Sequence, residues 1–121
     1  MAEAFKVLGQ ADTSNTLFGT TLYTVPTKPN SGFAARNVSQ TLVASLVVCN
    51  RDSSSGDYSV RVIPSGETDG NKHTIFLGKA IAANDTHVIS LGLVMQAGDT
   101  IKVSSGSGDD RSMSAFGVEM V

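Results

Sequence analysis

The chain has 121 residues, a length typical of a single domain with one hydrophobic core. Nine Lys and Arg against eleven Asp and Glu give a net charge of −2 with both signs spread along the chain, which excludes the basic patch that nucleic acid or an anionic membrane requires. No apolar run approaches the roughly 18 residues of a membrane span, and the start lacks the features of a secretory signal, so we expect synthesis in the cytoplasm and no membrane partner.

Eight segments show the alternation, or the density of β-branched and apolar residues, that is typical of strands. Turns rich in Gly, Ser, Asp and Pro separate them, and no segment of ten or more residues keeps helical spacing. In chain order, the predicted strands are Phe5–Leu8, Thr21–Val25, Gln40–Cys49, Tyr58–Ile63, His73–Ile81, Thr86–Met95, Asp99–Ser105 and Met113–Met120.

The run from Gln40 to Cys49 predicts a central strand with both faces covered. Simple alternation assigns its apolar residues to two faces, Leu42, Ala44, Leu46 and Val48 on one and Val43, Val47 and Cys49 on the other. Cys49 is the only cysteine, so an intramolecular disulfide is excluded, and a lone thiol in such a run is typical of a small buried hydrophobic residue.

Residues 84–110 hold two apolar runs bordered by acids. We interpret 97–99 as the hairpin between two neighbouring strands. Asp85 and Asp99 stand at strand entrances, where short polar side chains accept hydrogen bonds from backbone N–H groups. The acids therefore indicate the corners of a β-fold more than a catalytic site.

Many short strands without intervening helices predict an all-β fold, an antiparallel two-sheet β-sandwich or jelly roll of about eight strands. We expect one sandwich domain over residues 21–121. Residues 1–20 form either a first strand on this domain or an arm that adds to a neighbouring subunit, and the sequence leaves both open.

The sequence offers no arrangement typical of catalysis or of a cofactor site. Two histidines, His73 and His87, are too few for a cupin-type metal centre, and we expect both to face solvent at strand ends. No nucleophile motif or phosphate-binding loop occurs, so we predict that the protein is not an enzyme and binds no cofactor or metal. Only Asp109 and Asp110, in a Ser/Gly-rich loop, remain as candidate ligand contacts.

Several apolar residues lie in polar segments or near the start of the chain. Each is either an anchor for a neighbouring subunit or a cover for its own sandwich. These candidate assembly contacts are Phe5, Leu8, Leu17, Phe18 and Phe33.

Five phrases of the sequence resemble small virion structural proteins of tailed bacteriophages, particularly marine and cyanobacterial phages. They are "MAEAFKVLGQ" at 1–10, "LYTVP" at 22–26, "LVVCNR" at 46–51, "AIAANDT" at 80–86 and "SAFGVE" at 114–119. The resemblance runs over nearly the whole chain, but it carries over no functional residue.

This resemblance implies a β-sandwich subunit of the virion, made in the bacterial host and assembled as a capsid decoration or cement protein, or in the tail or neck. It implies phage capsid or tail proteins as partners, and a homo-oligomer, trimer or dimer, because symmetric contacts multiply weak affinity. The alternative is a virion-borne carbohydrate-binding module that presents three loops to host glycans, Ser53–Gly56, Gly66–Asn71 and Ser104–Asp110.

Overall fold

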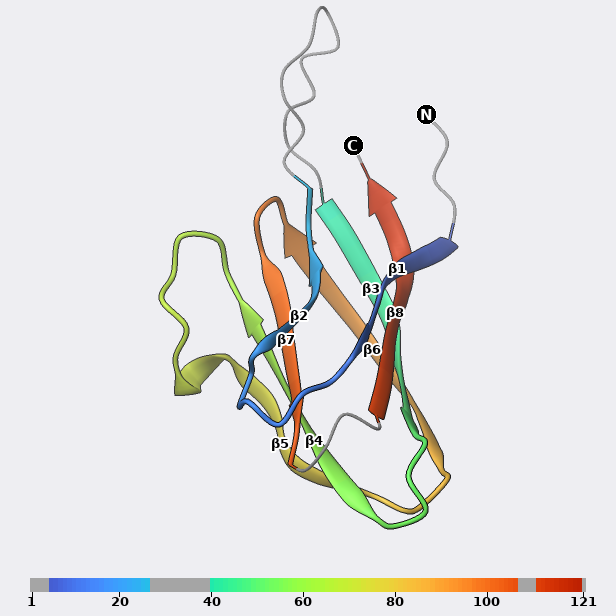
Figure 1. Ribbon diagram of the computed structural model, residues 1–121. Coiled ribbons are helices and arrows are strands. Elements are labelled where there is room, and N and C mark those ends of the chain that lie inside the picture. Colours follow the sequence, from blue (N-terminus) through green and yellow to red (C-terminus); the bar gives the residue numbers. More distant parts are fainter. Residues whose placement is uncertain (1–4, 27–39, 107–110, 121) are drawn as a thin grey trace, which may run out of the picture.

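The chain forms two antiparallel four-stranded sheets that pack face to face, which confirms the predicted all-β sandwich (Figure 1). The structure is a computed structural model and describes residues 5–26, 40–106 and 111–120. The described strands are β1 (Phe5–Asp12), β2 (Thr20–Thr24), β3 (Gln40–Asn50), β4 (Gly56–Ile63), β5 (Thr74–Ile81), β6 (Thr86–Gln96), β7 (Thr100–Ser105) and β8 (Arg111–Met120). A single 3-10 turn, Asn71–His73, precedes β5.

The strand order identifies the sandwich as a jelly roll. Sheet A has the order β1-β8-β3-β6, and sheet B has the order β2-β7-β4-β5. The first strand therefore pairs with the last, the second with the seventh, the third with the sixth and the fourth with the fifth, all antiparallel. This nested pairing is that of one long hairpin rolled up, which is the double Greek key of jelly rolls.

The start of the chain belongs to its own sandwich. Phe5–Asp12 pairs with β8 of the same chain, with Phe5 opposite Val118 and Asp12 opposite Ser112. Within the described chain this segment is therefore the first strand of sheet A, whereas an arm that adds to a neighbouring subunit stays a prediction.

The faces of β3 differ from those that simple alternation predicts. The strand bulges between Val43 and Ser45, so its buried residues change phase along its length. Val43, Leu46 and Val48 point into the core, whereas Leu42 lies on the outer face. A bulge inserts one residue into the ladder and thereby exchanges inward and outward positions beyond it.

The connection at 97–99 also differs from the predicted hairpin. β6 belongs to sheet A and β7 to sheet B, so this segment crosses from one sheet to the other. Asp99 fixes the crossover, because its carboxylate accepts hydrogen bonds from the backbone N–H of Ser65 (2.8 Å) and of Gln96 (2.8 Å). Asp85 likewise accepts from the N–H of Thr86, so the role predicted for both acids is confirmed.

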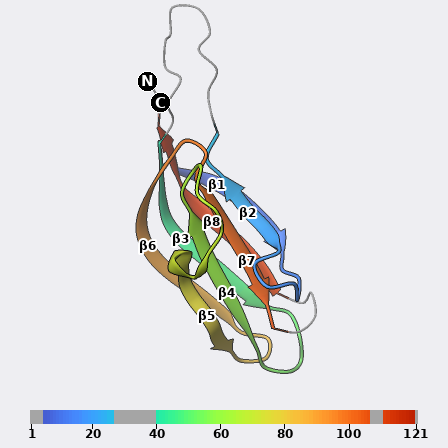
Figure 2. The ribbon, with the colours of Figure 1, turned by 90° about the vertical axis from the view of Figure 1, so that its left-hand side faces the viewer.

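The two long sides of the sandwich are unlike each other. On one side β1 lies so close to β2 that a Cβ added to Gly9 would come within 2.2 Å of the carbonyl oxygen of Leu22. On the other side β5 and β6 are the last strands of their sheets, and Figure 2 shows β6 at the opposite margin from β2. The core is thus closed along β1 and β2 and less covered along β5 and β6.

Asn50 ties together the loops at one end of the sandwich. Its fully buried side chain donates to the carbonyl oxygens of Ser54 (3.0 Å) and Ala82 (3.1 Å). Its side-chain oxygen accepts from the N–H of Asp52 (3.0 Å). The Asn50 amide, with all these bonds formed, therefore holds together the loop between β3 and β4 and the loop between β5 and β6, both of which cross between the sheets.

Candidate interaction surface

Sheet A carries apolar side chains on the face that points away from the core. One row crosses all four strands, because Phe5 lies opposite Val118, Val118 opposite Leu42, and Leu42 opposite Val94. Its two ends are the most open, with Phe5 74% exposed and Val94 60% exposed. This row is an unbroken apolar band on the surface of the subunit.

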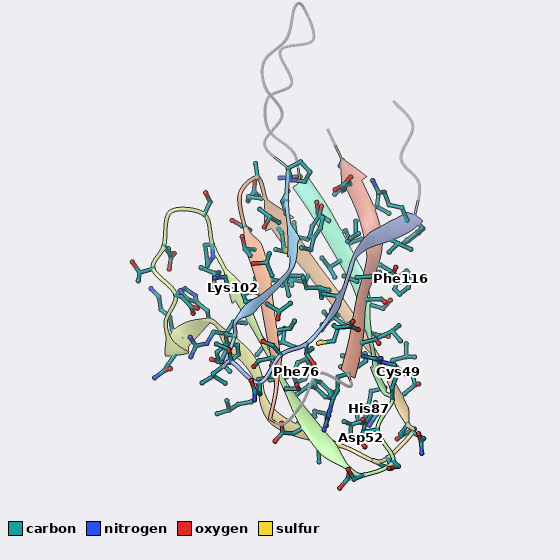
Figure 3. All side chains as sticks on the ribbon, viewed as in Figure 1. Cys49, Asp52, Phe76, His87, Lys102 and Phe116 are labelled. Carbon is teal, nitrogen blue, oxygen red and sulfur yellow. The ribbon has the colours of Figure 1, made fainter. Side chains whose placement is uncertain are left out.

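Two further apolar pairs extend the band along the sheet. Val7 lies opposite Phe116, and Val47 lies opposite Val88. Phe116 projects from β8 on the side away from sheet B (Figure 3). We call this surface the sheet A face, and its residues are Phe5, Val7, Leu42, Val47, Val88, Val94, Phe116 and Val118.

The outer surface of sheet A is close in size to a protein interface. Four strands spaced about 4.8 Å apart and about 33 Å long give this surface about 600 Å². The apolar rows are part of it, because polar pairs such as Ser45–Ser90 and Gln10–Ser114 lie between and beside them. A specific protein interface covers about 800 Å² per partner, and contiguous exposed apolar patches of several hundred Å² mark interaction sites.

Polar groups border the face along β1. Lys6 forms an ion pair with Glu119 (2.9 Å), and Asp12 forms one with Arg51 (3.0 Å). Gln10 donates a hydrogen bond to the hydroxyl of Ser114. An apolar centre with a polar margin is the usual composition of protein interfaces.

A buried hydrogen-bond network lies behind the border at the Lys6 end. The Tyr23 hydroxyl donates to Glu119 and is 2.9 Å from the hydroxyl of Thr41. Burial, and then the neighbouring carboxylate of Glu119, raise the pKa of the Tyr23 hydroxyl far above its usual value. The phenol therefore stays neutral and links β2 to β3 and β8 at physiological pH.

The predicted assembly contacts have different places in the structure. Phe5 lies on the sheet A face, and Leu17 is 63% exposed in the connection before β2. Leu8 is only partly exposed and packs against the core. Phe33, with the candidate ligand contacts Asp109 and Asp110, lies outside the described residues.

Phe18 requires a correction, because its side chain is used inside its own subunit. It is only 4% exposed, and the guanidinium carbon of Arg61 lies 3.9 Å from the centre of its ring. This cation–π contact covers the ring on the outer side of sheet B. Phe18 is therefore a cover for its own sandwich and not an exposed anchor.

Arg61 is a central residue that sequence reasoning missed. Its three nitrogens donate to the side chains of Asp69 (2.6 Å), Asn71 (2.7 Å) and Thr74 (2.9 Å). It thereby fixes the long connection between β4 and β5 while it covers Phe18. Arg61 alternates with inward residues along its strand, and this pattern alone predicts only a solvent-exposed side chain.

The two histidines do not face solvent as predicted. His73 is only 6% exposed, and its Nε2 is 3.1 Å from the carbonyl oxygen of Thr68. His87 lies on the inner side of β6, where its Nδ1 is 2.9 Å from the hydroxyl of the buried Tyr58. The contact of His87 joins two strands far apart in the sequence, whereas that of His73 is local, to a residue five positions earlier in the same connection.

Cys49 is also placed differently from its prediction. It is half-buried on the outer side of β3, opposite Thr86 of β6 and Ser112 of β8. The thiol therefore lies beside the sheet A face and not in the core.

The loops proposed to bind glycans do not form one surface. Ser53–Gly56 precedes β4 and Gly66–Asn71 follows it, so the two lie at opposite ends of that strand. The end of β7 does approach the first of them, since Ser105 lies opposite Tyr58 near the start of β4. The first two loops therefore do not share one binding site, and residues 107–110 of the third lie outside the described residues, so glycan binding by the loops stays a prediction.

In the described part of the chain, no group of three or more His, Cys, Asp or Glu side chains is placed to hold a metal ion. Residues 5–26, 40–106 and 111–120 also contain no helix long and apolar enough to cross a membrane.

Comparison with known proteins gives little similarity. No family of known proteins matches the sequence, and no curated protein matches it at a significant level. A chain in the structure of infectious bursal disease virus, Gt strain, is similar over 98% of this chain, with 14% identity and a TM-score of 0.34. The present chain spans 33% of that viral chain.

Proposed function

We propose that the protein is a non-enzymatic structural component of a bacteriophage virion and that it docks on assembled virion subunits through the sheet A face. The observation that carries this proposal is the apolar row from Phe5 to Val94 across the outside of sheet A. The resemblance of the sequence to small virion proteins of tailed phages supports phage capsid or tail proteins as the partner.

The docking is driven by the burial of apolar side chains. Phe5 supplies an aromatic ring, which buries more area than any aliphatic residue on the face. Each exposed apolar side chain contributes about 1.5–3 kcal/mol when fully buried, less the cost of association. Contacts repeated over a symmetric lattice then convert a modest affinity into firm retention.

The jelly roll keeps the docking face preformed. Backbone hydrogen bonds of four paired strands hold the apolar row in register, so little conformational entropy is lost when it binds. This suits a protein whose role is to reinforce or decorate a surface, and we propose capsid decoration as that role, with a tail or neck position as the alternative.

Binding of the purified full-length chain to particles of its virus tests the proposal. Particles stripped of this protein are mixed with tagged chain and sedimented, and the bound fraction is measured. We expect Phe5→Glu and Val94→Glu each to weaken binding at least 10-fold, because each places a charge in the apolar row.

Leu17→Glu is the matched control. Leu17 is as exposed as Val94 but lies outside the sheet A face, so this variant should bind like the native chain. If Leu17→Glu abolishes binding while Phe5→Glu and Val94→Glu do not, the docking surface is assigned wrongly. A reconstruction of the particle then separates decoration, with icosahedral density, from a tail or neck role, with axial density.

A further inference from the structure

The side of the sandwich along β5 and β6 exposes apolar residues on both sheets. Of the seven exposed large hydrophobic residues described, Ile75 and Leu77 lie on β5, and Val88 and Val94 lie on β6. Ile75 and Leu77 flank the inward Phe76, so they point away from the core on sheet B. They do not belong to the sheet A face.

Between these two exposed rims, the core itself is incompletely covered. Four of the half-buried residues that pack on the core come from the same two strands, namely Phe76, Ile89, Leu91 and Leu93. An open hollow of about 370 Å³ lies at one end, lined by Lys79, Thr86, His87, Val88 and Ile89. We call the whole surface the open side; its own apolar residues are Ile75, Phe76, Leu77, Ile89, Leu91 and Leu93, and at the rim of β6 it shares Val88 and Val94 with the sheet A face.

The open side lacks most features that protect sheet edges from pairing. β6 is 11 residues long and has no Asp, Glu, Lys or Arg, and Lys79 is the only charged residue of β5. Proteins protect exposed edges with charges, prolines, bulges or a covering segment. Here bulges are the device present: the pairing of β5 with β4 shifts register at Ile75 and again near Gly78, and the pairing of β6 with β3 shifts near Gly92; Gly78 and Gly92 have positive φ.

The opposite side shows what a protected edge looks like in the same molecule. β1 carries the charged residues Lys6 and Asp12, both in ion pairs, and β2 covers it closely at Gly9. The lack of protecting charges is therefore a property of the open side and not of every edge of this sandwich.

We propose that the open side is the contact between two copies of this chain, related by a two-fold axis. A two-fold contact uses the same patch twice, so the patch must be complementary to itself. An apolar, nearly uncharged band meets this condition, and a strand edge pairs antiparallel with its own copy about such an axis. The net charge of −2 produces little repulsion between the copies.

The available area matches the requirement of a stable dimer. The length of the open side is that of β6, whose 11 residues extend about 36 Å. Its height is about 20 Å, because the two sheets lie about 10 Å apart and each carries outward side chains. The product is about 700 Å² per subunit, against about 800 Å² per partner in standard interfaces. Apolar packing of the rims supplies the contact, and main-chain pairing is confined to the stretches of β6 on either side of the bulge.

Leu77→Lys tests the contact without touching the sheet A face. The mass of the full chain is measured by sedimentation equilibrium over a wide concentration range. We expect the native chain to be a dimer of twice 12.6 kDa and Leu77→Lys to raise its dissociation constant at least 30-fold. Leu17→Lys, at an equally exposed site elsewhere, should stay dimeric.

Hydrogen exchange gives a second readout that does not depend on a variant folding. Amides of β6 should exchange more slowly in concentrated native protein than in dilute protein, whereas amides of β1 should not change. A native chain that is monomeric at all concentrations, a trimer, or a dimer that withstands Leu77→Lys would overturn the proposal.

Phe5 belongs to the sheet A face alone, so Phe5→Glu separates this proposal from the docking function, whereas Val94→Glu changes a residue that both surfaces share. Phe5→Glu should remain dimeric and lose binding to particles, because Phe5 lies on the sheet A face and at the other edge of the sheet. A dimer with intact particle binding in Phe5→Glu would refute the docking surface and leave the two-fold contact standing. A monomer with lost particle binding in Phe5→Glu would refute the separation of the two surfaces and with it the two-fold contact.

Discussion

Replacing Arg61 by alanine should destabilise the sandwich strongly although Arg61 lies on an outward face. The change removes the hydrogen bonds that Arg61 donates to two uncharged acceptors, Asn71 and Thr74. Each of these bonds contributes about 1 kcal/mol to the stability of the fold. The ion pair with the partly exposed Asp69 contributes up to about 1 kcal/mol after solvent screening. The cation–π contact with Phe18 adds about 1 kcal/mol.

Because these contacts share one side chain, we expect a combined loss of about 3 kcal/mol and not their full sum. For 121 residues the entropy of unfolding is about 250 cal/mol/K, so the Tm should fall by about 12 °C. Urea unfolding followed by circular dichroism gives the free energy, and a thermal scan gives the Tm.

Two control variants sharpen the measurement on Arg61. Arg61→Lys keeps the charge but cannot reach three acceptors at once, so it should lose about half as much stability. Lys72→Ala removes the exposed ion pair with Glu67 and should change stability by less than about 0.5 kcal/mol. If Arg61→Ala loses less than about 1 kcal/mol, the guanidinium does not hold Phe18 and the β4–β5 connection in place.

Three further predictions follow from contacts in the core and on the sheet A face. Asn50→Ala should lose about 2–3 kcal/mol in urea unfolding, because two loop carbonyls and one N–H lose their buried partner; a loss below about 1 kcal/mol would contradict this. The raised pKa of Tyr23 means that the ionised phenol is disfavoured in the folded chain. The free energy of unfolding is therefore retained below pH 10 and falls above pH 10 by up to about 1.4 kcal/mol per pH unit. In Tyr23→Phe this fall should shrink to the part due to Tyr58, whose pKa burial also raises; unfolding between pH 8 and 11 compares the two chains. Cys49 should react with a maleimide in the free protein and be protected on particles, and equal labelling rates would contradict docking by sheet A.

The sequence predicts the strands well because each apolar run ends at a Gly, Pro, Ser or Asp turn. All eight predicted strands overlap the strands of the structure, most with ends shifted by one or two residues. Local turn chemistry was also predictable, since Asp85 and Asp99 satisfy backbone donors beside them. These features depend on residues a few positions apart.

Features that depend on distant partners were not predictable in the same way. The bulge at Val43–Ser45 exchanged the faces of β3, although Gly92 in the partner strand was an available signal for irregular pairing. The short connection at 97–99 resembles a hairpin, and only the pairing of β7 with β2 and β4 shows that it crosses between sheets.

The sheet A face was missed for the same reason. Phe5 was a candidate contact, but its neighbours in the apolar row, Val118, Leu42 and Val94, come from three other strands. Their alignment requires the register of the whole sheet, which no single stretch of the chain encodes. Phe18 shows the reverse case, because its exposure depends on Arg61, 43 positions away in the sequence.

The tight approach of β1 to β2 at Gly9 has a consequence for how large an assembly can grow. A sandwich with two bare edges would add copies at both ends and lengthen without limit as a ribbon. In this chain β2 lies against β1 at Gly9, so a two-fold contact along β5 and β6 would leave no second open side, and the assembly would stop at two copies. The close approach of the two strands would thereby oppose the growth of fibres.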